Sequence, residues 1–175
     1  MTDGKDVTRV AAQAPTIFSY AYRPIQPVDD WDIPFTINID AQGILCYDVY
    51  TLMQDGQYRS VDRQAFRLSP DVFHRIVESI RYAKPWMRHM PPRIQLTDDP
   101  GAEYTFCLDR LPVFRIYDME SLLARDYRST RGHYTRLVYC LLEDISQLLS
   151  RDGLMLTPDT FDPSEVYAPS EAAQA

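Results

Sequence analysis

Cysteine and histidine are scarce in this chain of 175 residues, and their scarcity excludes several kinds of chemistry. The three cysteines, Cys46, Cys107 and Cys140, lie far apart, form no CxxC pair and have no histidine at a spacing that suits zinc. The three histidines are scattered as well, so we expect neither a metal site nor a cofactor. The odd number of cysteines and their apolar neighbours predict buried, reduced thiols.

Long apolar runs are missing too. The longest, residues 137–142, is far too short to span a bilayer, and the N-terminal residues show no apolar core of a secretory signal. The sequence therefore predicts a cytoplasmic protein that does not enter a membrane. It leaves open a secretion route that needs no cleaved signal.

The net charge of −7 belongs to the two ends of the chain rather than to its body. Residues 1–32 carry three basic and five acidic side chains, and residues 152–175 carry five acidic and no basic ones. Residues 33–151 hold 15 of each and are neutral. Because nucleic-acid binding normally needs a basic surface, the sequence argues against a nucleic-acid partner.

Composition divides the chain into one domain with two tails. Residues 1–16 are polar or small and predict a disordered N-terminus, and residues 157–175 predict a flexible acidic tail. Residues 17–156 are long enough to form a single α+β domain with a core of its own. Within it, the apolar residues 17–22 predict an extended arm that lies on the domain or on a second copy of it.

Residues 35–67 alternate between apolar and polar side chains, which predicts a three-stranded antiparallel meander. Turns that end at Gly43 and Gly56 set the register. On the apolar face the expected pairs are Phe35 with Val49, Ile37 with Tyr47, Ile39 with Leu45, and Leu45 with Phe66; nearer the second turn, Thr51 should meet Ser60 and Met53 should meet Tyr58. The polar face should hold Arg59, Arg63 and Arg67 in one row. That row fits an anion-binding stripe, but a solvated strand face is the more ordinary interpretation.

Two main helices are expected to cover the apolar face. The first begins after Ser69 and should end at Lys84, because the residue before Pro85 avoids helical geometry. The second spans about 130–150 and follows a short helical piece near 119–124. Strands near Ile94, at 104–108 and at 111–117 lie between the helices, with Leu96 expected opposite Tyr104 and Ile94 opposite Phe106.

The predicted order is therefore β-β-β-α-β-β-β-(α)-α, an α+β fold of antiparallel meanders packed against two helices. Residues 33–84 and 92–151 share the pattern strand, turn, strand, strand, helix. An internal βββα duplication would explain this pattern, and so would two common modules that meet by chance, because residue identity between the halves is slight.

Residues 125–136 carry four arginines and are the best candidate for ligand chemistry. The segment enters the long helix, where free N–H groups favour anions. Arg128, Arg131, His133 and Arg136 are therefore candidate ligands of a phosphate or carboxylate. An ordinary loop and helix start would use the same residues. His133 has no nucleophile or paired carboxylate beside it in sequence, so we assign no catalytic residue.

Twelve tyrosines, seven phenylalanines and two tryptophans make the chain rich in aromatic residues, which are favoured at protein interfaces. The candidate partner-binding residues are Trp31, Trp86, Tyr50, Arg59 and Arg63. The sequence thus predicts a non-catalytic protein-binding module of the cytosol that binds a protein partner or a second copy. Such a module would be an adaptor, an inhibitor or immunity-type protein, or a chaperone-like protein. The alternative is a small anionic-ligand-binding or enzymatic domain that uses residues 125–136.

Overall fold

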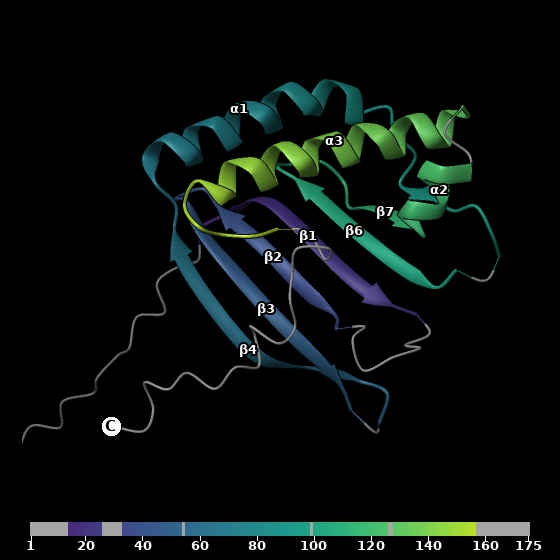
Figure 1. Cartoon of the computed structure of the whole chain (residues 1–175), viewed down its shortest axis with the longest axis horizontal. Helices are drawn as coiled ribbons and strands as arrows, with labels where there is room; N and C mark the ends of the chain where they lie inside the picture. Colours follow the sequence, from purple (N-terminus) through teal and green to yellow (C-terminus); the bar gives the residue numbers. More distant parts are fainter. Residues whose placement is uncertain (1–13, 26–32, 54, 99, 126–127, 157–175) are drawn as a thin grey trace, which may run out of the picture.

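In the computed structural model, seven strands from the described part of the chain form one sheet, and helices cover one of its faces (Figure 1). The structure describes residues 14–25, 33–53, 55–98, 100–125 and 128–156. The elements are β1 (Thr16–Pro24), β2 (Phe35–Asp40), β3 (Ile44–Leu52), β4 (Tyr58–Arg67), α1 (Pro70–Met87), β5 (Arg93–Ile94), β6 (Ala102–Leu108), β7 (Phe114–Tyr117), α2 (Met119–Arg125) and α3 (Thr130–Ser150). The predicted α+β class is confirmed, whereas the predicted tails lie outside the described residues except for 14–16.

The segment predicted as an arm is instead a central strand. The sheet has the order β4-β3-β2-β1-β6-β7-β5, and β1 pairs antiparallel with β2 on one side and β6 on the other. Its inward side chains Phe18 and Tyr20 are fully buried. The strand begins at Thr16, inside the predicted N-terminal tail. If β1 were absent, strands β2 and β6 would each have an unpaired edge. An apolar segment with strand alternation can pair with both edges, which explains its position between them.

The predicted meander is confirmed for β2 and β3, whose register matches at every expected pair. Between β3 and β4, Leu45 meets Phe66 as expected, but Met53 N bonds Gln57 O at 2.8 Å, so the register near the turn is shifted by one residue. A β-bulge at Val61 restores it.

This bulge changes the face on which one arginine lies. Thr51 meets Arg59 rather than Ser60, so Arg59 shares the face of the helices, while Arg63 and Arg67 lie on the open face. The predicted row of three arginines is therefore wrong. An extra residue in one strand exchanges the two faces for every side chain beyond it.

The second half of the sheet also departs from the prediction. Strand β5 pairs parallel with β7, and Tyr104 and Phe106 of β6 meet Ile116 and Phe114 of β7. The predicted pairs of Ile94 and Leu96 with β6 are wrong, because both edges of β6 are already occupied by β1 and β7. The two halves thus differ in topology, which argues against the duplication.

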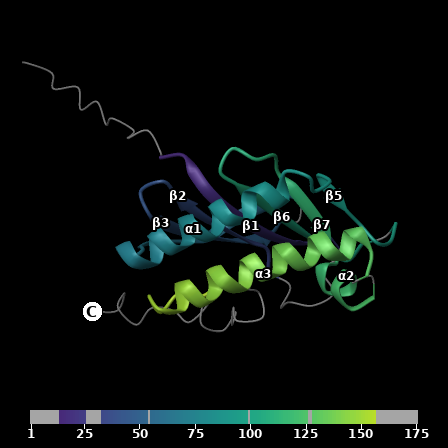
Figure 2. The ribbon, with the colours of Figure 1, turned by 90° about the horizontal axis from the view of Figure 1, so that it is seen from above.

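Helices α1 and α3 lie side by side and antiparallel on the same face of the sheet (Figures 1 and 2), and α2 packs against α3. Buried residues of both helices join the sheet in one apolar core, with Val72, Ile76 and Ile80 from α1 and Val138, Leu142 and Ile145 from α3. No described helix covers the opposite face.

Helix α1 continues past the point where it was expected to end. Pro85 lies inside the helix, and the last turn reaches Met87, which is buried. Proline removes one backbone hydrogen bond, a cost that is smaller near a helix end than in its middle. Burial of Met87 offsets that cost, and the extension carries Trp86 onto the helix.

Candidate functional site

A groove of about 530 Å³ separates α1 from α3 on the side of the helix layer that faces solvent. Among the described residues, its lining comes from these two helices: Glu78, Ser79, Tyr82, Ala83, Trp86 and Met87 from α1, and His133, Leu137, Cys140, Leu141 and Asp144 from α3. On each helix they recur at steps of three or four residues. They therefore form two facing stripes along the helix axes.

Two aromatic side chains stand exposed on the α1 wall of this groove. Tyr82 is 78% exposed and Trp86 is 54% exposed, and they are one helical turn apart. The floor between the helices includes Met87 and Leu141, both buried, and Leu137, which is partly buried. Large aromatics beside an apolar hollow are the usual composition of a protein-binding hot spot.

The α3 wall carries an exposed thiol, Cys140. The predicted burial of all three cysteines is wrong for this residue and incomplete for Cys46 and Cys107, which are half-buried. Helix α3 turns Val138, Leu141 and Leu142 toward the core, so position 140 points to the groove. Cys140 is therefore a natural chemical reporter of groove occupancy.

The charged and titratable side chains of the groove differ between its two ends. Because α1 and α3 run antiparallel, Glu78 and Asp144 lie at one end, on opposite walls. His133 lies at the other end and also lines a neighbouring hollow of about 420 Å³ with Arg128, Ser129, Thr130 and Arg136. One end of the groove thus carries two carboxylates, and the other end, at His133, adjoins a hollow lined by Arg128 and Arg136.

The structure brings together three of the four predicted anion ligands. Arg128, His133 and Arg136 line one hollow, whereas Arg131 turns to the sheet side and its Nη1 donates to Gln95 O at 3.0 Å. Ser129 caps α3, because its hydroxyl accepts from Gly132 N at 3.0 Å. The side-chain hydroxyl thus satisfies one of the free N–H groups that were expected to attract an anion.

The predicted partner-binding residues do not share one surface. Trp86 lies on the groove, whereas Tyr50 and Arg63 lie on the open face of the sheet and Arg59 on the other face. Trp31 is outside the described residues. Sequence reasoning missed Tyr82, although its position four residues before Trp86 and away from the apolar stripe of α1 was a usable signal.

Charged groups on the open face pair with one another. Arg63 Nε lies 3.6 Å from Asp48 Oδ1. Glu103 Oε2 accepts from Tyr117 Oη at 2.7 Å, and this hydrogen bond raises the pKa of Tyr117. The guanidinium of Arg93 lies 4.8 Å from the centroid of the same tyrosine ring. These internal pairs make the open face a weaker candidate than the groove.

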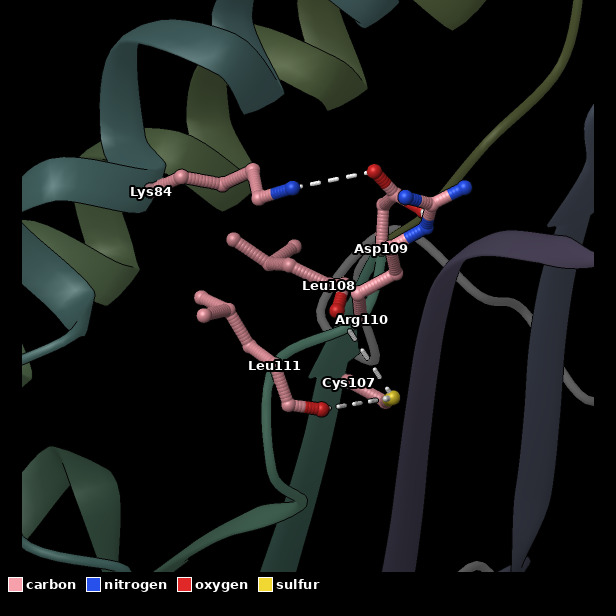
Figure 3. A network of polar contacts seen from close by, with 6 residues as sticks. All are labelled: Lys84, Cys107, Leu108, Asp109, Arg110 and Leu111. Atoms are coloured by element: carbon pink, nitrogen blue, oxygen red, sulfur yellow. Dashed lines mark hydrogen bonds and ion pairs between the residues drawn. The ribbon is translucent and has the colours of Figure 1, made fainter.

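An ion pair outside the groove lining joins the end of α1 to the sheet (Figure 3). Lys84 Nζ donates to Asp109 Oδ2 at 2.9 Å, just past the end of β6. Burial, with a further contribution from Asp109, raises the pKa of the nearby Cys107 thiol, so this cysteine is less reactive than a free one. The ion pair holds the turn of α1 that carries Trp86.

A hydrogen bond from the sheet also holds the chain that follows α3. The hydroxyl of Tyr47 donates to Met155 O at 2.5 Å, and Leu156 beside it is fully buried. Burial raises the pKa of Tyr47 from 10.0 to about 12. The neutral phenol is therefore favoured in the folded state.

This shift predicts a loss of stability in alkali. The unfolded chain ionises Tyr47 near pH 10 and the folded chain only near pH 12, so the free energy of unfolding should be constant below pH 10 for this group. It should then fall by up to about 3 kcal/mol as pH rises to 12. Urea unfolding from pH 8 to 11.5 measures this, and Tyr47→Phe should flatten the fall.

Tyr82→Phe is the matched control, because it removes one exposed phenol and should keep the wild-type pH dependence. If Tyr47→Phe loses stability as steeply as the wild type between pH 10 and 11.5, burial of the Tyr47 phenol is not the cause of the loss.

No protein-family model and no curated protein matches the chain. Among the described residues, no group of histidine, cysteine or carboxylate side chains could hold a metal ion. Within the same ranges, no helix is long and apolar enough to cross a membrane.

Proposed function

We propose that this chain is a non-catalytic protein-binding module that receives an amphipathic helix of a partner protein in the groove between α1 and α3. The observation that carries the proposal is the pair Tyr82 and Trp86, exposed beside an apolar floor. Aromatic side chains supply most of the binding energy at many interfaces, because they bury a large area and lose little conformational freedom.

The shape of the groove favours a helix as its occupant. The lining spans ten residues of α1 and twelve of α3, about 15 to 18 Å, which is about three helical turns. A third helix that lies between two neighbours packs its ridge into their shared groove, and recognition of this kind uses apolar anchors at steps of three and four residues.

The separation of His133 from Asp144 favours a binding role over acid–base catalysis by this pair. His133 and Asp144 lie eleven residues apart on one straight helix, so about 16 Å separates them along the axis. A general acid and base must both reach one substrate within hydrogen-bonding distance. This pair is too far apart to do so.

The proposal includes the cytosol as compartment and an adaptor, inhibitor or chaperone-like role. Each of these roles needs a preformed apolar surface that a partner can enter and leave. An exposed thiol such as Cys140 stays reduced in the cytosol, whereas an oxidising compartment would favour its pairing.

The test begins with co-purification from the native host and identification of the partner. The purified partner and chain are then titrated by calorimetry, and Trp86→Ala and Tyr82→Ala should each raise Kd about 30-fold, as hot-spot losses of about 2 kcal/mol require. Because both side chains are exposed, neither variant should change the melting temperature by much.

Val61→Ala is the matched control, since Val61 is 50% exposed but lies on β4. Its Kd should equal that of the wild type. A partner that binds all three variants with wild-type affinity would place the binding surface elsewhere.

The anionic-ligand alternative has one observation in its favour, the hollow shared by Arg128, His133 and Arg136. A thermal-shift screen with phosphates, nucleotides and carboxylates tests it, because a ligand at about 100 times its Kd adds about 2.7 kcal/mol to stability. A shift that Arg136→Ala abolishes and Arg131→Ala leaves intact would move the functional assignment to this hollow.

A further inference from the structure

We infer that the helix which enters the α1–α3 groove belongs to another protein and carries basic side chains at one end, an apolar stripe in the middle and acidic side chains at the other end. This inference rests on the proposed function and adds the chemistry and the orientation of the partner. Its basic end lies over Glu78 and Asp144, and its acidic end lies over His133 and Arg136.

The charge of the groove carries the inference. Glu78 and Asp144 are both exposed and stand on opposite walls, so this end of the groove carries two carboxylates, and His74 Nε2 lies 3.4 Å from Glu78 Oε1. At the other end, His133 and Arg136 are exposed beside Arg128. Rim charges of this kind contribute mainly to the choice and orientation of a partner, while the apolar centre supplies affinity. A helix inserted the wrong way round would place like charges together at both ends.

The chain's own tails do not match this pattern. Residues 157–175 contain four acidic and no basic side chains, so they could complement only the basic end. Residues 1–13 contain both signs of charge but offer no aromatic residue, leucine or isoleucine as an anchor. Neither tail combines apolar anchors with both charges.

A second copy of the chain meets a conflict between shape and charge. Two helix layers interdigitate if the two-fold axis runs along the helices, with α1 of each copy in the groove of the other. That arrangement sets Glu78 and Asp144 against the same residues of the second copy. If the two-fold axis instead runs across the helices, the acidic groove end of each copy meets the basic groove end of the other. In that arrangement α1 of one copy stacks on α1 of the second copy, so Tyr82 and Trp86 lie against that helix and both grooves stay unfilled. A single foreign helix satisfies shape and charge together.

The experiment uses a displayed library of 16-residue helices with a leucine stripe and with lysine, glutamate or glutamine at random in the first and last turns. Selection on the full chain should enrich lysine at one end and glutamate at the other. Selection on Glu78→Lys/Asp144→Lys should enrich glutamate at both ends. The double variant Asp62→Lys/Glu143→Lys has the same net charge outside the groove lining, so its selection should match that of the wild type.

Alkylation of Cys140, read from its own tryptic peptide, locates the bound helix, and the selected peptide should slow it at least tenfold. Peptides that protect Cys140 but show no charge preference, or one sign at both ends, overturn this inference and leave the proposed function standing. A library without any peptide that protects Cys140 overturns both. Sedimentation of the free chain as a dimer that Trp86→Glu dissociates would assign the groove to a second copy instead.

Discussion

A chain that begins at Ile25, and so lacks β1, should not fold, whereas a chain that begins at Ala14 should melt like the full-length protein. Strand β1 is the neighbour of both β2 and β6 and holds the two halves of the sheet together. Its loss removes Phe18 and Tyr20 from the core and leaves two long strand edges unpaired. Circular dichroism and urea unfolding measure the outcome.

The two truncated chains distinguish the loss of β1 from the loss of the residues before it. A chain that begins at Ala14 keeps Pro15, whose carbonyl accepts from Ala41 N at 2.8 Å, and all of β1. A cooperative transition in the chain that starts at Ile25 would contradict the central position of β1. Recovery of folding by an added synthetic peptide of residues 14–24 would confirm that the strand itself is what is missing.

Replacement of Tyr20 by alanine should destabilise the protein by about 3 to 5 kcal/mol, the range for loss of a buried aromatic side chain. The Tyr20 ring is fully buried and stacks on Phe106 with centroids 5.2 Å apart. The Phe35 ring meets it edge-on at 5.7 Å. One substitution therefore removes ring contacts with both neighbouring strands, β2 and β6.

Tyr82→Ala makes the same chemical change on the surface and should shift the free energy of unfolding by well under 1 kcal/mol. Urea denaturation at pH 7 compares the two variants directly. Equal losses in both would show that the aromatic cluster around Tyr20 does not stabilise the sheet as its packing implies.

The sheet and the groove have separate physical roles in this molecule. The apolar face of the sheet holds α1 and α3 through their inner stripes, so their outer stripes are free to form a surface. The Lys84–Asp109 ion pair and the buried Met87 hold the end of α1 in place. A preformed groove loses little conformational entropy when a partner binds, which favours affinity.

Three of the candidate ligands that are close together in the chain are also close together in space. Arg128, just before the cap of α3, and His133 and Arg136, on its first turns, line one hollow. Sequence reasoning failed for Arg131, whose partner Gln95 is 36 residues away. It also grouped Trp86 with Tyr50 and Arg63, which lie on the far side of the sheet.

Local patterns by themselves determined the α+β class, the register of β2 against β3 and the span of α3. These features depend on short-range patterns: apolar–polar alternation, a glycine at the turn and a serine that caps the helix. Each pattern involves only a few neighbouring residues, so it can be recognised in a single sequence. Only the tertiary structure decided that β1 lies in the middle of the sheet, that the bulge at Val61 moves Arg59 to the other face, and that β5 joins β7. Strand order depends on which edges remain unpaired after distant segments have met. The groove exists only because α1 and α3, separated by the 42 residues 88–129, share one face of that sheet.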